Sequence, residues 1–490
     1  MSELRRAACV GGGVIGAGWV ARLVGNGVDV RVYDPAPDVA TTIDAMLANG
    51  RRATAALTAA PRPAEGRVTL CTALADAVRD AELIVESVPE QPALKRAVVA
   101  QIEAAARPDA IIASSTSGIV PTQLQCDMRH PQRLLVAHPF NPVYLLPLVE
   151  VVGGQRTAAA AIERAMAMYR ALGMYPLRVR KEIDAFIADR LLEAVWRESL
   201  WLVSDGVATT QEIDDAIRFG FGLRWAQMGL FETYRIAGGA AGMRHFLQQF
   251  GPCLSWPWTK LMDVPTFDDA LVERIAQQSE AQSGAYTIRE LERIRDDNLI
   301  GMLHVLKQRG WGAGRVLADH ERRLRRQAPQ SDDDASQPLH TLAIAVPAHW
   351  VDYNDHMTEA RYLECFSNAT DNFMAHIGAD QAYVDSGHSY FTVETHLRHL
   401  REARVDQRLT VTTQVLLGVG KKLRLFHRLW DASGVLIATG EQLLIHVDLT
   451  TRAASEPTAE VAANLRRIAQ QHAGLPAADG AGRLAAGRTV

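Results

Sequence analysis

The sequence lacks the features that mark secreted scaffolds and nucleic-acid-binding proteins. Its 490 residues include only five cysteines, none in a C-x-x-C pair: Cys9, Cys71, Cys126, Cys253 and Cys365. An odd, dispersed set of cysteines predicts reduced thiols in a cytoplasmic protein rather than a disulfide framework or a metal site. The 52 basic and 56 acidic residues leave a formal net charge of −4. This balance favours neither nucleic acid nor an anionic membrane as a partner.

Long uninterrupted apolar runs are also missing. The apolar region from Leu134 to Val152 is broken by His138, Asn141 and three prolines, so we expect no membrane-spanning segment. The apolar stretch at residues 7–21 follows two arginines, but its five glycines and its continuation into a second strand pattern argue against a signal peptide. The remaining composition, 48% hydrophobic and 22% charged, is typical of a folded protein of about three domains.

Strand and helix patterns alternate through the first third of the chain. The strand patterns lie at Ala7–Val10, Val28–Tyr33, Leu83–Ser87, Ala110–Ser114 and Leu134–His138. This alternation predicts a mainly parallel, Rossmann-type doubly wound α/β sheet over residues 1–182. Helical periodicity dominates residues 183–317, which predicts an all-α domain.

The composition changes again beyond residue 317. Residues 318–338 hold an arginine-rich stretch followed by proline, serine and three aspartates, which predicts a linker. Residues 339–455 combine one helix pattern, Thr358–Ile377, with several strand patterns, as in a small α+β domain. These strand patterns are Thr410–Leu417, Leu423–Trp430 and Gln442–Leu449. Residues 456–490 predict one helix and then a disordered tail.

A glycine-rich loop follows the first predicted strand. The run Gly11-Gly12-Gly13-Val14-Ile15-Gly16 fits G-x-G-x-x-G at a helix start, and Asp34 ends the next strand. The loop amides and the helix dipole would bind a pyrophosphate, and Asp34 would bind the ribose hydroxyls. Because Asp34 would repel a 2′-phosphate and no arginine follows it, NAD is favoured over NADP. FAD binding uses the same device, but the motifs that follow argue against it.

Five further motifs follow in order: residues 81–90 (AELIVESVPE), 114–118 (SSTSG), 137–142 (AHPFNP), 148–152 (LVEVV) and 186–192 (FIADRLL). Together they resemble the 3-hydroxyacyl-CoA dehydrogenase family over residues 1 to about 317. The nearer relatives in that family include L-gulonate and L-carnitine dehydrogenases. The resemblance implies that Glu90, Lys95 and Asn141 contact the cofactor, and that residues 183–317 form the domain for substrate binding and dimerisation.

The chemistry of these motifs is that of secondary-alcohol oxidation. A base must take the hydroxyl proton while hydride leaves for the nicotinamide, and His138 is suited because imidazole titrates near neutral pH. Glu150 would fix the imidazole tautomer and stabilise the imidazolium that forms. Ser117 would hydrogen-bond the reacting oxygen. The family resemblance implies the same three roles.

One position departs from the family pattern. The usual asparagine before Arg-Leu-Leu, which touches substrate and cofactor in the family, is Asp189 here. A carboxylate there would repel acidic or CoA-linked substrates and would favour a cationic one such as carnitine. The alternatives are a neutral exchange of near-isosteric residues, with L-gulonate or a short 3-hydroxyacyl-CoA as the substrate.

An aromatic cluster in the helical region supports a cationic substrate. Trp225 and Phe231 could hold a quaternary ammonium group by cation–π contacts, and Arg224 could bind a substrate carboxylate. The other interpretation of the cluster is a helical core or a dimer interface.

A second catalytic motif lies in the C-terminal domain. The run from Trp350 to Leu363 resembles the D-x-N-G-H signature before the central helix of hot-dog-fold thioesterases of the 4-hydroxybenzoyl-CoA type. The resemblance implies Asp352 as the catalytic carboxylate and Asn354 and His356 as supporting groups. Asp355 replaces the usual glycine, which leaves the geometry of the turn open. A carboxylate could attack a thioester or activate water, and free amides near Glu359 could bind the carbonyl oxygen. Sites of this fold form between protomers, which implies a homodimer.

A dehydrogenase, a linker and a hot-dog domain in this order resemble the family of fused carnitine dehydrogenases and betainyl-CoA thioesterases over almost the whole chain. This implies a bifunctional cytoplasmic enzyme that oxidises carnitine to 3-dehydrocarnitine and hydrolyses betainyl-CoA. The alternative of a different class is a hot-dog domain that only dimerises the protein or senses acyl-CoA.

Overall fold

The computed structural model describes residues 4–237, 246–248, 259–260, 268–327, 337–347 and 350–482. These residues form two compact units. The first comprises Met1–Val24, Val28–Leu47 and Gly66–Ala318, and the second comprises Gly25–Gly27, Ala48–Glu65 and Asp319–Val490. Within the described ranges, no helix has the length and apolar character needed to cross a membrane. Four of the cysteines are free thiols, and Cys253 lies outside the described residues.

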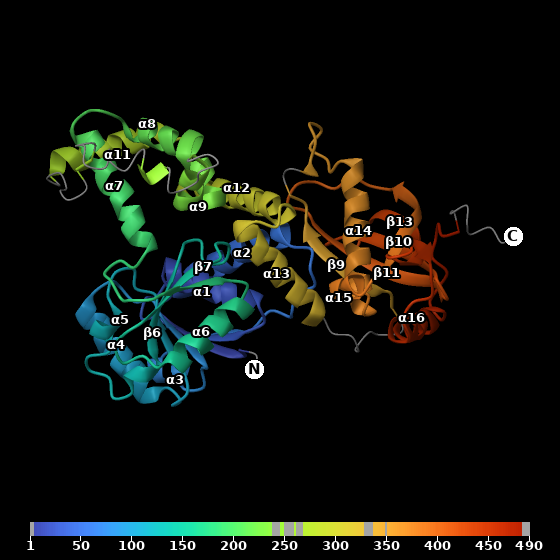
Figure 1. The fold of residues 1–490 in the computed structure, drawn as a ribbon, viewed down its shortest axis with the longest axis horizontal. Helices are drawn as coiled ribbons and strands as arrows, with labels where there is room; N and C mark the ends of the chain where they lie inside the picture. The colour runs from blue at the N-terminus through green and yellow to red at the C-terminus, as the bar shows by residue number, and fades with distance from the viewer. Residues whose placement is uncertain are drawn as a thin grey trace. The chain divides into compact units, whose positions relative to one another are not determined.

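The first unit is built on an eight-stranded sheet in the order β3-β2-β1-β4-β5-β6-β7-β8 (Figure 1). Only β6 and β7 pair antiparallel; the other neighbours are parallel. The five strands predicted from the sequence are confirmed to within two residues, because four are short, mostly apolar runs and β2 alternates apolar with polar residues. The strands are β1 (Arg6–Val10), β2 (Asp29–Tyr33), β3 (Val68–Leu70), β4 (Leu83–Glu86), β5 (Ile111–Ser114), β6 (Leu134–Pro139), β7 (Leu148–Gly153) and β8 (Tyr175–Val179).

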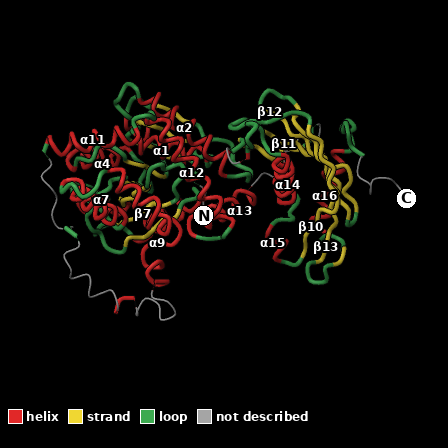
Figure 2. Tube along the Cα trace, turned by 90° about the horizontal axis from the view of Figure 1, so that it is seen from above, coloured by secondary structure: helices red, strands yellow, loops and turns green. Residues whose placement is uncertain are grey.

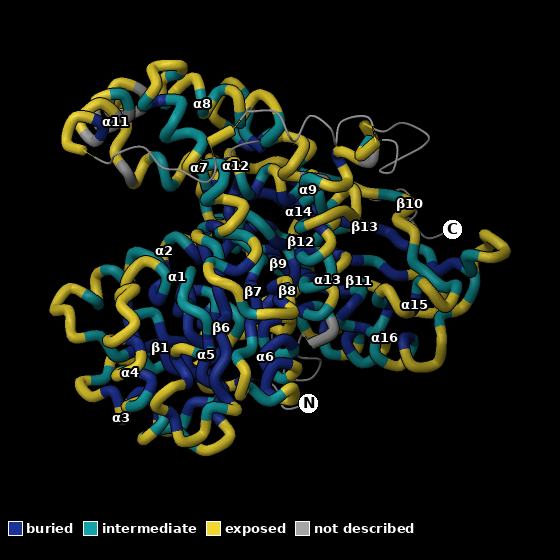
Figure 3. The backbone as a smooth tube through the Cα atoms, turned by 60° about the vertical axis from the view of Figure 1, so that its left-hand side comes forward, coloured by how far each residue is buried: buried dark blue, intermediate teal, exposed yellow. Residues whose placement is uncertain are grey.

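Helices cover this sheet because alternate strand residues point to opposite faces. One face, which carries Ile84, Ile112 and Val136, packs against α3, α4 and α5 in a continuous apolar core. On α1 and α6, the Trp19 and Tyr169 rings lie 5.4 Å apart, and both side chains are buried. Figure 3 shows the strands as the buried centre of the unit. The helices are α1 (Val14–Gly25), α2 (Val39–Leu57), α3 (Leu74–Val78), α4 (Pro92–Ala105), α5 (Pro121–Leu124) and α6 (Ala159–Ala171).

Helices follow from residue 188 onward, as predicted. They are α7 (Ala188–Ser204), α8 (Thr210–Ala216), the π-helical η2 (Ile217–Phe221), α9 (Gly222–Ala237), α11 (Asp269–Ser283), α12 (Ile288–Gln308) and α13 (Gly312–Gln327). Large apolar side chains on α7 and α9 remain exposed, including those of Leu191, Trp196 and Phe231. These elements therefore present apolar surface that the described part of the chain does not cover.

Helix α13 corrects the predicted linker, which was expected to begin at residue 318. The arginine-rich stretch continues the helix to Gln327. The reason is a buried stripe at helical spacing, formed by Leu317, Glu321 and Leu324. The arginines at 322, 323 and 325 are half-buried or exposed on the other faces of the helix. Residues 328–336 of the predicted linker, and residues 483–490 of the predicted tail, lie outside the described residues.

The second unit is an antiparallel sheet packed on one long helix, α14 (Glu359–His376), as Figure 2 shows. The sheet order is β10-β13-β12-β11-β9, with β14 paired to β13. A side chain at Gly440 of β13 would lie 2.5 Å from the ring of Phe366 on α14, so glycine permits the close contact. The strands are β9 (Leu339–Ala345), β10 (His388–His399), β11 (Arg408–Val419), β12 (Lys422–Asp431), β13 (Leu436–Asp448) and β14 (Ala453–Ala454); short α15 (Gln381–Asp385) and terminal α16 (Ala459–His472) complete the unit.

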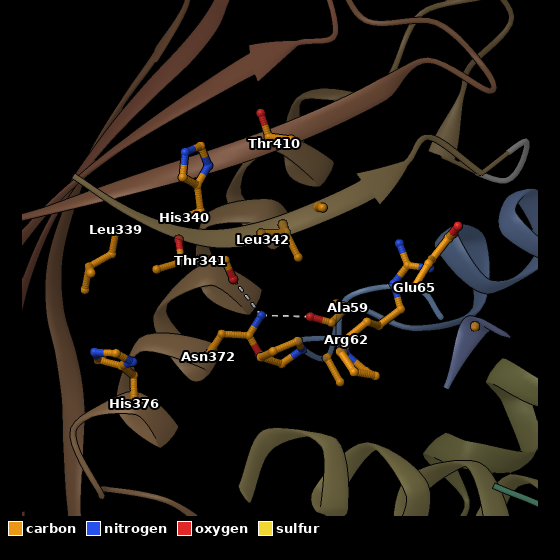
Figure 4. A pocket seen from close by; sticks show the side chains of 15 residues that line it. Ala59, Arg62, Glu65, Leu339, His340, Thr341, Leu342, Asn372, His376 and Thr410 are labelled. Carbon is orange, nitrogen blue, oxygen red and sulfur yellow. Dashed lines mark hydrogen bonds between the residues drawn. The ribbon is translucent and has the colours of Figure 1, made fainter. Parts of the chain in front are cut away.

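The segment Ala48–Glu65 belongs to this second unit through Asn372 of α14. The buried Asn372 amide donates hydrogen bonds to the carbonyls of Ala59 and Thr341, each 2.7 Å long (Figure 4). A pocket of about 480 Å³ adjoins this contact, and its lining includes Arg62, His340 and His376. The sequence offered no signal for this arrangement, because the hydrogen bond joins residues 313 positions apart.

Candidate active sites

The glycine-rich loop joins β1 to α1 and leaves room for a ligand. Gly11 has a φ of +97°, and a Cβ atom on Gly16 would lie 1.9 Å from the Gly11 carbonyl oxygen. The tight turn therefore requires glycine at both positions. A Cβ on Gly13, in contrast, would meet no atom within 4 Å, and the side chain of Val14 is exposed. The loop backbone is thus accessible to a pyrophosphate at the start of α1.

Asp34 lies at the end of β2 beside this loop. Its Oδ2 accepts a 2.6 Å hydrogen bond from the Gly12 amide, and its Oδ1 accepts one of 2.7 Å from the Ala36 amide. The carboxylate is therefore fixed next to the site of the pyrophosphate, where a ribose would follow. These residues fit NAD, which accepts hydride at its nicotinamide ring when bound.

His138 and Glu150 are brought together by the antiparallel pairing of β6 and β7, in which they occupy opposite positions. His138 Nδ1 lies 3.0 Å from Glu150 Oε2. Both side chains are buried, Glu150 completely. The Glu150 carboxylate accepts a hydrogen bond from Nδ1–H, which leaves Nε2 as the basic nitrogen of the ring. This is the orientation that a proton acceptor requires.

Glu150 also fixes the start of α7. Its Oε1 accepts hydrogen bonds of 3.0 Å from the amides of both Ile187 and Ala188. The chain reaches this point through Ala185 and Phe186, which have φ values of 58° and 51°. As a result, Asp189 Oδ2 lies 3.7 Å from His138 Nε2. No motif in the sequence indicated that one carboxylate would bind both the histidine and the start of the helix that carries Asp189.

Burial raises the pKa of Asp189, and the nearby carboxylates of Glu150, Glu193 and Glu90 raise it further, while His138 lowers it. The imidazole therefore lies between two carboxylates inside a cluster of acidic groups. Such a site stabilises a cation and repels an anion at the same distance.

Among the remaining predicted cofactor and substrate groups, Ser117, Glu90 and Asn141 lie on loops, and Lys95 lies on α4. Ser117 is exposed, and its amide donates a 3.2 Å hydrogen bond to Glu90 Oε1. Lys95, in contrast, is only 1% exposed. Its ammonium lies 2.9 Å from Glu86 Oε1 and 3.3 Å from Glu90 Oε2. Asn141 is exposed just after β6. Glu86 is a buried charged residue that the sequence interpretation missed, and its only signal was a carboxylate at the end of an apolar strand.

Arg224, Trp225 and Phe231 lie on α9, and all three are exposed. The Trp225 ring lies 4.6 Å from that of Phe221. Among the described residues, no hydrogen bond or ion pair joins this cluster to His138 or Asp189. The cluster therefore contributes exposed aromatic surface, and its contact with substrate stays a prediction.

The second candidate site is the turn before α14. Asp352 Oδ1 accepts a 2.9 Å hydrogen bond from the Asn354 amide, and the Asp352 amide donates to the His356 carbonyl. Asp355 has a φ of +60°, so the position where the related signature has glycine keeps a left-handed conformation. His356 Nε2 lies 2.9 Å from Glu402 Oε2. Asp352 is partly exposed, and α14, whose first amides have no partner within the helix, starts at Glu359.

Family comparisons match these two regions. The NAD binding domain of 3-hydroxyacyl-CoA dehydrogenase matches residues 6–183, and the C-terminal domain of that enzyme matches residues 186–266. The thioesterase-like superfamily matches residues 346–465. Fold and family matches together define the chain as an NAD-dependent dehydrogenase joined to a thioesterase.

Relatives that match nearly the whole chain identify a more specific family. The chain is 57% identical over 478 residues to the L-carnitine dehydrogenase/betainyl-CoA thioesterase of Ruegeria pomeroyi, covering 97% of this chain and 98% of the relative. It is 54% identical over 490 residues to the protein of the same name from Rhizobium meliloti, covering 99% of each. The chain belongs to the L-carnitine dehydrogenase/betainyl-CoA thioesterase family.

The dehydrogenase part also matches relatives that lack the second part. It is 53% identical over 308 residues to the L-carnitine dehydrogenase of Pseudomonas aeruginosa, which is 63% of this chain and 96% of that protein. Among solved structures, an NAD⁺-dependent 5-formyl-3-hydroxy-2-methylpyridine 4-carboxylic acid 5-dehydrogenase matches with a TM-score of 0.53 and 28% identity. That match covers 62% of this chain and 99% of the other.

Proposed function

We propose that this chain oxidises L-carnitine to 3-dehydrocarnitine with NAD and hydrolyses betainyl-CoA to betaine and CoA. The observation that carries the first activity is the position of Asp189 Oδ2, 3.7 Å from His138 Nε2. A carboxylate beside the catalytic base suits a substrate that brings a positive charge. It disfavours L-gulonate and 3-hydroxyacyl-CoA, both of which are anionic.

In the proposed dehydrogenation, His138 Nε2 takes the proton of the 3-hydroxyl group as C3 loses hydride to the nicotinamide. Glu150 stabilises the imidazolium that results, because its carboxylate accepts from Nδ1 at 3.0 Å. Ser117 donates a hydrogen bond to the reacting oxygen. Asp189 attracts the trimethylammonium group, and the exposed aromatic groups Trp225 and Phe231 bind its methyl surface, with Arg224 at the substrate carboxylate.

In the proposed hydrolysis, Asp352 either attacks the thioester carbonyl or activates a water molecule for the attack. The amides at the start of α14 stabilise the negative charge on the carbonyl oxygen. Asn354 and His356 support Asp352 from the same turn, and Glu402 orients the imidazole of His356. The thiolate of CoA leaves and takes up a proton derived from water. If Asp352 itself attacks, a mixed anhydride forms, and water then hydrolyses it to betaine and the free Asp352 carboxylate.

We further propose that the enzyme is a cytoplasmic homodimer. Support comes from β10, which lies at one end of its sheet and exposes Phe391 and Val393. Exposed edge strands readily pair with a second chain. The exposed apolar side chains of α7 and α9 offer a second surface that a partner would cover. Reduced cysteines and the cofactors NAD and CoA agree with a cytoplasmic location.

NADH formation by the purified chain tests the dehydrogenase. We expect turnover with L-carnitine and little with D-carnitine, L-gulonate or a short L-3-hydroxyacyl-CoA. Turnover of only the last two would keep His138 and Glu150 in their roles and refute the cationic substrate.

Release of free thiol from betainyl-CoA tests the second activity. A chain that binds this thioester without hydrolysing it would support the alternative, in which the C-terminal domain dimerises the protein or senses acyl-CoA.

A further inference from the structure

A buried ion pair lies beneath the dehydrogenase site. The carboxylate of Glu86, at the end of β4, is fully buried, and the ammonium of Lys95, on α4, is 1% exposed. Lys95 Nζ lies 2.9 Å from Glu86 Oε1 and donates a 2.9 Å hydrogen bond to the Val88 carbonyl. Two charges removed from water in this way need close partners, because burial of either one alone is strongly unfavourable.

Both oxygens of Glu86 are occupied. Oε1 also accepts from the Val88 amide at 2.8 Å, and Oε2 accepts from the Ser114 hydroxyl. Ser114 is buried and ends β5, the strand next to β4. Glu86 thus joins the carboxyl ends of two adjacent parallel strands, the edge of the sheet from which the dehydrogenase loops emerge.

The pair reaches the dehydrogenase site through Glu90. Lys95 Nζ lies 3.3 Å from Glu90 Oε2, and the Glu90 side chain is 46% exposed. Glu90 Oε1 in turn accepts from the amides of Ser117 and Gly118, at 3.2 and 3.3 Å. One continuous series of contacts therefore runs from Glu86 through Lys95 and Glu90 to the backbone of Ser117.

We infer that Glu86 is a positioning residue for the dehydrogenase reaction, which acts through Lys95 and Glu90 to set the place of Ser117. This rests on the proposed function, in which Ser117 binds the reacting oxygen. Loss of the Glu86 charge leaves Glu90 as the remaining carboxylate partner of a buried ammonium. The Lys95–Glu90 contact then changes, and with it the backbone of the Ser117 loop. A displacement of about 1 Å at such a group can cost on the order of 10²-fold in rate.

A double-mutant cycle tests the route. We expect Glu86→Gln to lower kcat for L-carnitine oxidation by about 10- to 100-fold at saturating NAD, where a change in cofactor affinity through Lys95 and Glu90 does not limit the rate. In the Ser117→Ala background the same substitution is expected to lower kcat only a few-fold, because the group that it positions is already gone. An equal loss in both backgrounds would overturn the inference, because Glu86 would then act elsewhere.

A second pair of variants separates positioning from stability. Replacing both charges, as in Glu86→Met with Lys95→Met, removes the buried ion pair without leaving one charge alone, and such exchanges can preserve stability. We expect this variant to unfold near the wild-type temperature and still to be slow. A folded double variant with wild-type kcat would overturn the inference. If it does not fold, the cycle with Ser117→Ala decides.

Two controls distinguish a failure of the positioning inference from a failure of the proposed function. Glu441 is a buried carboxylate paired with Arg424 in the other unit, and Glu441→Gln should leave NADH formation unchanged. Wild-type protein that oxidises a different alcohol would refute the substrate assignment, and the variants would then be compared on that alcohol.

Discussion

His138 and Asp352, the two groups proposed to begin the two reactions, lie in opposite surroundings. His138 is buried and held by the fully buried Glu150, whose second oxygen is bound to two backbone amides. Asp352 is partly exposed on a turn, and the neighbouring Tyr353 is 95% exposed. One chain therefore completes the polar contacts of the first site, while the second lies open at the surface. The difference agrees with the proposal that a second protomer completes the thioesterase site.

The largest effect is expected at the enclosed site. His138→Gln should lower kcat/KM for L-carnitine oxidation by about 10³-fold, because general-base catalysis is lost. Initial rates of NADH formation measure this loss. His130→Gln, which alters an exposed histidine of the same unit, should retain the wild-type rate. A loss below about ten-fold for His138→Gln would contradict the assignment of the base.

A substitution at the exposed thioesterase site should reduce the reaction rate somewhat less. Asp352→Asn should lower the rate of betainyl-CoA hydrolysis by about 10²-fold, because an amide cannot attack the thioester or activate water. Asp355→Asn is the matched control, since asparagine tolerates the left-handed conformation of that position. Similar losses for both variants would mean that the turn is only structural, as in the alternative of a non-catalytic module.

The fold and the two candidate sites could be predicted from the sequence only in part. The strands β1, β4, β5 and β6 were predictable because each is a buried apolar run, and β2 because its apolar and polar residues alternate. The strands β3 and β8, which are shorter or more exposed, were not predicted. The Asp352 turn was predictable because its residues resemble a known signature. The two linkages of Glu150, the burial of Lys95 and the role of Asn372 depend on partners distant in sequence. The part of helix α13 beyond residue 317 was missed because its charged residues resemble a linker, and only the spacing of Leu317, Glu321 and Leu324 predicts that the helix continues.

The two units should also differ in acid stability. His427 of β12 is fully buried between the hydroxyls of Thr413 and Thr370, and burial lowers its pKa to about 4. In the unfolded chain the histidine has a pKa of about 6.5, so between pH 6.5 and pH 4 the unfolded chain binds the proton more readily than the folded protein. The second unit should therefore lose about 2 kcal/mol of stability between pH 7 and pH 5.

Hydrogen exchange of the β12 and β13 amides in the full chain, corrected for intrinsic rates, measures this loss. His427→Gln should reduce the pH dependence, whatever its effect on stability at pH 7. Unchanged pH dependence in that variant would show that another group titrates.

The smallest effect concerns substrate charge. Asp189→Asn should raise KM for L-carnitine about ten-fold, but not for the analogue in which a tert-butyl group replaces trimethylammonium. Because burial raises the pKa of Asp189, its charge is lost at a higher pH than for an exposed aspartate. KM of the wild type should therefore rise as the pH falls through that region, and the variant should lack this rise. Equal effects on both substrates would contradict the cation assignment.

The most direct test of two separate active sites is to measure both reactions on the same preparations of wild type, His138→Gln and Asp352→Asn. NADH formation from L-carnitine and CoA release from betainyl-CoA would be followed in parallel. The account predicts a reciprocal pattern, in which each variant loses its own reaction and keeps the other near the wild-type rate. Loss of both reactions in either folded variant, or no hydrolysis by the wild type, would contradict it.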